Sequence, residues 1–192
     1  MTDDLRNEVF RIKDPISFEE TAIRVFRYQM QNNTVYSEYV SLLGHSVRYP
    51  ETLVEIPFLP AELFKTRKIL SDGMSYEIVF ESSRTTGTTS SMHYIHDPGL
   101  YKESFLRSFR IFYGDPSGYF IAALLPSYSE RKNSSLIYMV NTLVELSASN
   151  GSRFYNNMYE NLFSDLKNAL RSGIKALLIG VSFALVDFAE KC

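Results

Sequence analysis

One nearly uninterrupted apolar stretch, residues 119–125, limits what this chain can fold into more than any other part of its 192 residues. A strand without a polar face has to be covered on both sides, which is typical of the centre of a parallel sheet between helices. A second apolar strand is predicted over residues 175–180, and the segments between the two carry helical patterns. This alternation predicts an α/β fold with a mixed, mainly parallel sheet flanked by helices.

The length and composition of the chain fit one domain over residues 1–192. A hydrophobic content of 45% and a charged content of 22% are ordinary for a globular protein. No internal repeat, low-complexity segment or convincing linker divides the chain. We therefore expect a single domain with no internal boundary.

Two helix starts are indicated by local chemistry. Residues 17–20, Ser-Phe-Glu-Glu, form a capping-box pattern that predicts a helix over about residues 18–31. Asp97 followed by Pro98 predicts another, because the aspartate side chain can cap the free amides and proline suits the first helical turn. The aromatic residues of this second helix share one face, which we expect to be core: Tyr101, Phe105, Phe109 and Phe112.

Charge and cysteine content exclude several classes of partner and location. The net charge is -2 with no block of Lys or Arg, which argues against a nucleic-acid partner. Cys192 is the sole cysteine, so a disulfide framework is excluded and a reducing compartment is favoured. The start of the chain lacks the features of a secretion signal, and the longest apolar run, residues 174–189, is interrupted and too short to span a membrane. A cytoplasmic protein is expected.

A hydroxyl-rich loop, residues 82–91, lies between two predicted strands, residues 74–80 and 92–95. Backbone amides and Ser/Thr hydroxyls in such a loop can surround phosphate oxygens, since a concave run of amides carries partial positive charge. The alternative is an ordinary solvated turn. The loop is neither a Walker loop nor a dinucleotide fingerprint.

Metal-ion and serine-hydrolase chemistry find little support in the sequence. His93 and His96 are three residues apart in a segment that is expected to be extended, and only Asp97 lies near them as a further ligand. No Gly-x-Ser-x-Gly turn is present. No metal site formed by protein side chains is predicted.

The hydroxyl-rich loop resembles the nucleotide loop of the adenylate-forming enzymes, which is approximately Ser/Thr-Ser-Gly-Thr-Thr-Gly. Here the corresponding residues are Ser82-Ser83-Arg84-Thr85-Thr86-Gly87. Within that superfamily the chain is most similar to the acyl-protein synthetases, the fatty-acid ligases of bacterial bioluminescence, which are related to phenylacetate-coenzyme A ligases. Other stretches resemble the same family in the same order: Ile56-Pro57-Phe58-Leu59-Pro60, Leu63-Phe64-Lys65, Phe112-Tyr113-Gly114, Leu124-Leu125-Pro126-Ser127-Tyr128, Glu130-Arg131 and Ser134-Ser135-Leu136.

The resemblance implies a fold, a reaction and a set of site residues. The fold is the N-terminal portion of an adenylate-forming enzyme. The reaction is attack of a carboxylic acid, such as a fatty acid, on ATP to give acyl-adenylate and pyrophosphate, followed by transfer of the acyl group to a thiol. Mg²⁺ would offset the phosphate charge. Phosphate-binding residues would be Ser82, Ser83, Thr85, Thr86, Gly87 and Thr88, and Tyr128 is a candidate wall of the acyl pocket.

Two departures from the family pattern keep a second hypothesis open. Arg84 stands where the family has glycine, which costs about 1–2 kcal/mol if that position is left-handed, and its bulk could fill the phosphate site. The family's later Tyr-Gly-x-Thr-Glu motif is missing, because Tyr113-Gly114 continues as Asp115-Pro116. The chain is therefore expected to be the front part of such an enzyme, shortened or degenerate. The competing hypothesis is a non-catalytic remnant that acts as a binding or interaction module.

Self-association is expected if the chain is only the front part of the fold. The front part of an adenylate-forming fold would leave a sheet edge or face uncovered near residues 174–189. Exposed strand edges and apolar faces favour pairing with another chain.

Overall fold

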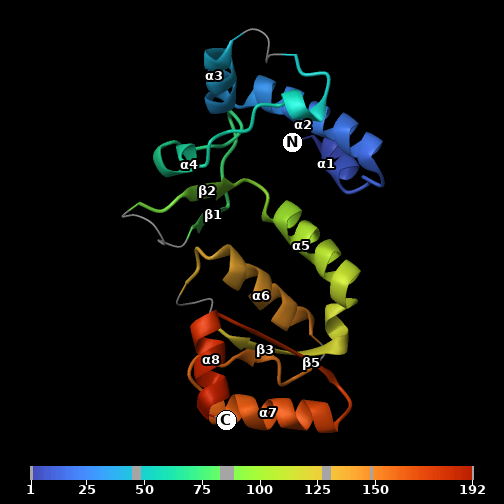
Figure 1. Ribbon diagram of the computed structural model, residues 1–192, viewed down its shortest axis with the longest axis vertical. Coiled ribbons are helices and arrows are strands. Elements are labelled where there is room, and N and C mark those ends of the chain that lie inside the picture. Colours follow the sequence, from blue (N-terminus) through green and yellow to red (C-terminus); the bar gives the residue numbers. More distant parts are fainter. Residues whose placement is uncertain (1, 45–48, 83–88, 127–130, 148, 192) are drawn as a thin grey trace. The chain divides into compact units, whose positions relative to one another are not determined.

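The computed structural model describes residues 2–44, 49–82, 89–126, 131–147 and 149–191. The chain divides into two compact units, Met1–Leu100 and Tyr101–Cys192, and both can be followed in Figure 1. The expectation of a single domain over residues 1–192 stays a prediction.

Unit 1 is mainly helical and ends in a small hairpin. Its helical segments are α1 (Asp3–Val9), α2 (Pro15–Asn32), α3 (Thr34–Leu43), the 3-10 turn η2 (Leu53–Glu55) and α4 (Leu63–Thr66). Phe26 of α2 packs with Tyr36 and Val40 of α3, and these three buried side chains form a core between the two helices. The strands β1 (Ile78–Glu81) and β2 (Met92–Ile95) pair antiparallel, with Phe80 opposite His93.

The start of α2 differs from the sequence-based expectation. Asp14, not Ser17, is the N-cap: its Oδ1 accepts a hydrogen bond from the backbone N of Ser17 at 2.8 Å. Ser17 Oγ in turn accepts from the backbone N of Asp14, so Ser17 takes the N3 position of the capping box. Pro15 follows as the first helical residue, and the prediction that Ser17 and Glu20 form the box was wrong. An Asp-Pro pair defines this end because the carboxylate caps and the proline ring is preset for a helix.

Unit 2 is an α/β unit around a parallel sheet. Helix α5 (Pro98–Tyr113) leads into it, and the remaining elements are η3 (Pro116–Gly118), β3 (Tyr119–Leu124), α6 (Ser135–Leu146), β4 (Arg153–Phe154), α7 (Tyr159–Arg171), β5 (Lys175–Gly180) and α8 (Ser182–Lys191). The described strands lie in the order β4-β3-β5, and both pairings are parallel. The predicted second strand, 175–180, coincides with β5.

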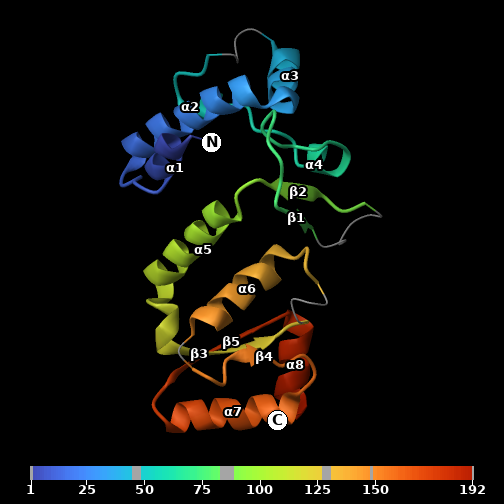
Figure 2. The same ribbon diagram turned by 180° about the vertical axis from the view of Figure 1, so that it is seen from behind.

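Both faces of the central strand β3 are covered, as its apolar sequence requires. Phe120, Ala122 and Leu124 pack toward α7 and α8, whereas Ile121 and Ala123 pack toward α6 on the other face, where α5 also contributes. Figure 2 shows α6 and α7 on opposite sides of the sheet. This small parallel sheet between helices confirms the α/β class.

The aromatic face of α5 is only partly a core face. Asp97 Oδ1 accepts from the backbone N of Gly99 at 2.8 Å, so the predicted Asp-Pro start is confirmed. Phe105 and Phe109 are buried, but Phe112 is 79% exposed, so its predicted place in the core was wrong. Helix α5 ends at Tyr113, and Gly114 follows it with a φ of +87°.

Candidate functional site

The carboxyl ends of β3 and β5 are neighbours in the sheet of unit 2. Leu124 pairs with Gly180 at this edge, and Ala123 pairs with Phe154 at the end of β4. From β3 the chain passes to β4 on one side of β3 and then crosses to β5 on the other side of β3. The direction in which strands are added to the sheet therefore reverses between β3 and β5. In open α/β sheets ligands bind outside the carboxyl ends of strands at such a switch point. Pro126, part of one stretch that resembles the family, lies two residues after the end of β3.

A glycine allows close packing at the switch point. A Cβ atom added to Gly180 would lie 2.9 Å from Cδ2 of Leu185 in α8 and 3.2 Å from Cβ of Leu124 in β3. Leu185 therefore packs directly over the end of β5 because residue 180 has no side chain. Helix α8 begins two residues later, at Ser182, and Ser134 caps α6 at the same edge, with its Oγ accepting from the backbone N of Ile137.

The hydroxyl-rich loop of unit 1 is tied at its base. Ser82 directly follows β1, and its backbone N donates to the carbonyl oxygen of Ser91 at 3.0 Å. The backbone N of Ser91 donates back to Ser82 Oγ at 2.9 Å. The Ser82 hydroxyl thus accepts one bond and keeps its own hydrogen for donation to another group. The expectation of a strand on each side of this segment is confirmed: the strands are β1 and β2, and β1 is shorter than the predicted residues 74–80.

Most of the predicted site residues lie outside the described part of the chain. Of the phosphate-binding set only Ser82 is described, and the others lie outside it: Ser83, Thr85, Thr86, Gly87 and Thr88. Arg84, Tyr128 and Glu130 also lie outside it. The roles that the resemblance implies for these residues stay predictions.

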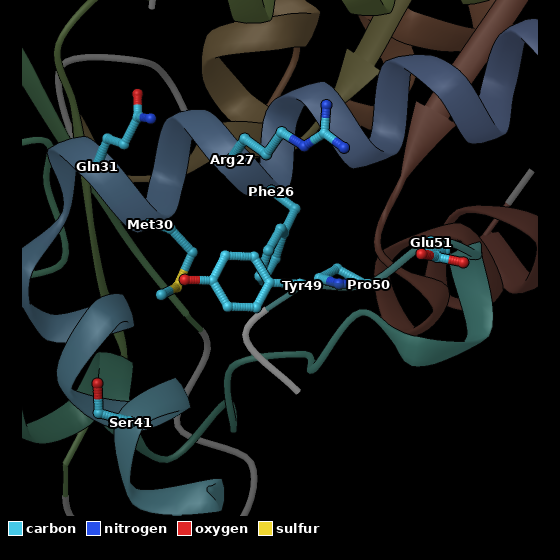
Figure 3. A pocket seen from close by; sticks show the side chains of 8 residues that line it. All are labelled: Phe26, Arg27, Met30, Gln31, Ser41, Tyr49, Pro50 and Glu51. Atoms are coloured by element: carbon cyan, nitrogen blue, oxygen red, sulfur yellow. The ribbon is translucent and has the colours of Figure 1, made fainter. Parts of the chain in front are cut away.

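A pocket of about 560 Å³ in unit 1 lies between α2 and the segment that leads into η2. Its floor is apolar: Phe26 and Pro50 are buried and Met30 is half-buried. Figure 3 shows the ring of Tyr49 lying beside the side chains of Met30 and Phe26. Tyr49 is itself 83% exposed, so the pocket is open to solvent on that side.

The rim of this pocket carries the polar groups. Arg27 and Gln31 are one turn apart on α2, and Figure 3 shows Glu51 at the other end of the pocket from Gln31. The guanidinium of Arg27 has no hydrogen-bond or ionic partner among the described residues. An apolar floor with one available guanidinium suits a molecule that has an apolar body and a carboxylate, because a guanidinium can fork two hydrogen bonds to it. Sequence patterns give no signal for this pocket, since its residues come from separate segments.

The two histidines of β2 and its end have structural partners. His93 stacks on Phe64 of α4, with ring centroids 4.6 Å apart. His96 holds the carbonyl oxygen of Ser75 through Nδ1 at 2.7 Å. Within the described ranges no three His, Cys, Asp or Glu side chains are grouped closely enough to hold a metal ion.

The largest pKa shifts belong to buried tyrosines. Burial raises the pKa of Tyr36 in unit 1 to about 12, and burial followed by the hydrogen bond to Asp165 raises the pKa of Tyr155 in unit 2 to about 12. Both hydroxyls are engaged, Tyr36 with the carbonyl oxygen of Pro57 at 2.6 Å and Tyr155 with Asp165 at 2.7 Å. In both cases burial of the side chain is the largest cause of the shift in pKa.

Among the described residues no helix has the length and apolar character needed to cross a membrane. Comparison of the chain with protein-family models, with curated proteins and with solved structures finds no match in any of the three.

Proposed function

We propose that this protein is an acyl-protein synthetase-like member of the adenylate-forming enzymes. A carboxylate oxygen of the acid attacks the α-phosphorus of ATP, pyrophosphate leaves, and an acyl-adenylate forms. A thiol then attacks the acyl carbon, AMP leaves, and a thioester and a proton are produced. The resemblance implies ATP with Mg²⁺ as cofactors, a carboxylic acid such as a fatty acid as substrate, and a thiol as acceptor.

The observation that carries the proposal is the hydroxyl-rich loop whose base is closed by Ser82 and Ser91. The loop has to present its hydroxyls and amides together if it is to surround phosphate oxygens, and a paired base fixes the separation of its two ends. The two mutual bonds between Ser82 and Ser91 supply that fixed base. Phosphoryl chemistry depends on such positioning of donors more than on covalent help from the protein.

The sheet of unit 2 gives independent support. Its switch point lies at the ends of β3 and β5, and the Leu124-Leu125-Pro126 part of the family resemblance begins there. A ligand site at this edge agrees with the general behaviour of open α/β sheets. Tyr128, the proposed wall of the acyl pocket, follows two residues after Pro126 in the sequence.

The pocket beside Tyr49 is a candidate for an apolar acid. Phe26, Met30 and Tyr49 offer apolar surface to a chain or ring, and Arg27 offers a positive charge to its carboxylate. This part of the proposal concerns unit 1 alone.

The second candidate function is a remnant that binds nucleotide or a partner without catalysis. It is favoured by Arg84, which replaces the glycine of the family's loop, and by the missing Tyr-Gly-x-Thr-Glu motif. A remnant predicts no chemistry with any acid, even if nucleotide binds.

Acid-dependent exchange of labelled pyrophosphate into ATP tests the proposal, with a panel of fatty and aromatic acids and Mg²⁺. The parent chain and the Arg84→Gly variant are assayed together, and Arg84→Gly is expected to be the more active. Ser82→Ala should lower exchange by about tenfold or more, because it removes a phosphate donor and loosens the loop base. Ser108→Ala, on the exposed side of α5, is the matched control and should behave as the parent. Arg27→Gln should raise the KM for the acid and leave that for ATP unchanged.

Each outcome separates the two functions. Exchange that requires both acid and Mg²⁺, and that falls in Ser82→Ala but not in the control Ser108→Ala, supports the ligase. Titration of Mg²⁺-ATP by calorimetry completes the experiment: binding without exchange in both Arg84 forms favours the remnant. Neither binding nor exchange in either form contradicts both the enzyme and the nucleotide site.

A further inference from the structure

A second pocket in unit 1, of about 680 Å³, takes no part in the proposed ligase reaction. It is lined by residues of α1, α2, α3, α4, β2 and the start of α5, and by the segments before α4, between α4 and β1, and between β2 and α5, all of them between Asp3 and Leu100. This volume lies within the range of about 300–1,000 Å³ that is usual for sites of small organic ligands.

Aromatic rings form much of the wall, and three of them are held in place by neighbours. Tyr36 is fixed by its hydrogen bond to the carbonyl oxygen of Pro57. Phe64 is stacked on His93 with an angle of 23° between the ring planes. Tyr94 packs edge to face against Tyr76, with ring centroids 5.0 Å apart. Rings that are already fixed lose little entropy when a ligand binds between them.

The charges that line the same pocket are mainly negative. Arg6 forms an ion pair with Asp97 at 2.5 Å, so its guanidinium is already balanced. The carboxylates of Asp3 and Glu77 have no hydrogen-bond or ionic partner among the described residues. His96 uses Nδ1 toward the carbonyl of Ser75; with Nδ1 as the donor, Nε2 is left as an acceptor. The charged groups that remain for a ligand are therefore the carboxylates of Asp3 and Glu77.

The same hairpin already holds an ammonium group against its aromatic rings. Nζ of Lys68 lies 4.6 Å from the ring centre of Tyr76 and 5.4 Å from that of Tyr94. The face of an aromatic ring attracts a cation because its quadrupole places negative charge there. Tyr94 thus contacts a cation through its ring and also lines the pocket.

We propose that this pocket binds an organic ammonium ion with an apolar or aromatic body. The body would lie among Tyr36, Phe64 and Tyr94, and the ammonium would face Glu77 and Asp3. The proposal is independent of the ligase function, because ATP and carboxylic acids are anions that this lining disfavours.

The test compares three ligands that share one apolar body: phenethylammonium, 2-phenylethanol and 3-phenylpropionate. Binding to the full chain is measured by calorimetry and by ligand-observed NMR at low salt, where charge effects are least screened. Phenethylammonium is expected to bind at least about tenfold more tightly than 3-phenylpropionate, with the neutral alcohol between them. Equal affinity for the ammonium and the carboxylate contradicts the proposal.

Two variants locate the site. Glu77→Gln should weaken phenethylammonium about three- to tenfold and leave 2-phenylethanol nearly unchanged, because it removes charge and keeps shape. Phe64→Leu keeps an apolar side chain but removes a ring, so it should weaken the ammonium more than the alcohol. Glu38→Gln, an exposed residue of α3 outside the pocket, is the matched control. If Glu38→Gln and Glu77→Gln act alike, the ammonium is held by overall charge and the proposed site is wrong. Far-UV circular dichroism checks that each variant is folded.

Discussion

Burial of the Tyr155 side chain makes the stability of the protein depend on pH. It is fully buried in unit 2 and donates to Asp165, which also pairs with Arg153 at 2.8 Å. Its pKa is raised to about 12, chiefly by burial, whereas an unfolded chain releases a tyrosine proton near pH 10. The folded state therefore keeps a proton that the unfolded state loses. Its contribution to stability is complete below about pH 10 and disappears as the pH rises toward 12.

Tyr155→Phe tests this coupling. At pH 8 the variant should be less stable by about 1 kcal/mol, because the contacts of the hydroxyl with Asp165 and with the carbonyl oxygen of Gly151 are lost while Asp165 keeps Arg153. Between pH 10 and 12 it should lose less stability than the parent, since it has no proton to release. Urea unfolding at several pH values measures both effects. Tyr36→Phe is the comparison in unit 1, where the pKa is likewise raised to about 12. Parallel losses with pH in the parent and Tyr155→Phe would contradict the assignment.

At the scale of the element, the start of α2 offers two possible N-terminal caps, and substitutions can distinguish between them. Asp14→Ala removes the acceptor of the Ser17 amide and should lower the free energy of unfolding, because an amide of the first helical turn loses its cap. Glu20→Ala should change it little, because Glu20 is not part of the capping box of the structure. Hydrogen exchange over the first turn of α2 should rise only in Asp14→Ala. A larger loss of stability in Glu20→Ala than in Asp14→Ala would contradict the cap at Asp14 and support the Ser17–Glu20 capping box.

The hairpin of unit 1 and the sheet of unit 2 differ in how far sequence could predict them. β2 and β5 coincide with their predicted ranges because each is a short apolar or alternating segment between clear turns. β1 begins later than predicted, at Ile78, and its register with β2 covers residues 78–81. Phe112 shows the same limit in a helix: its spacing matches Phe105 and Phe109, but its side chain is exposed.

At the scale of the whole molecule, self-association remains a prediction, and the sheet of unit 2 indicates which surface would be involved. β5 is an edge strand of the described sheet, and Phe183 of the following helix is 88% exposed. Exposed edges and apolar side chains favour contact with a second copy. Light scattering should show a mass that rises with concentration, and Phe183→Asp should reduce the rise. Ser104→Asp, on the exposed side of α5, controls for added charge, and a monomer at every concentration contradicts the prediction.

The sequence alone determined the α/β class, the central position of β3 and the strands that bracket the hydroxyl-rich loop. These features follow from the periodicity of apolar residues within short segments. They also follow from the fact that an apolar strand has to be covered on both faces. The cap at Asp14 is also indicated by the local sequence, in an Asp-Pro pair. A competing Ser-x-x-Glu pattern three residues later led to the wrong prediction.

Only the tertiary structure decided the strand order β4-β3-β5, the close packing of Leu185 over Gly180 and both pockets of unit 1. The pocket of Arg27 and Tyr49 joins residues more than twenty positions apart, and the pocket of Arg6, Phe64 and Glu77 joins segments farther apart still. Such sites depend on which faces meet when helices and strands pack. Their residues carry no shared period or spacing along the chain, because a cavity is formed by surfaces and not by consecutive residues.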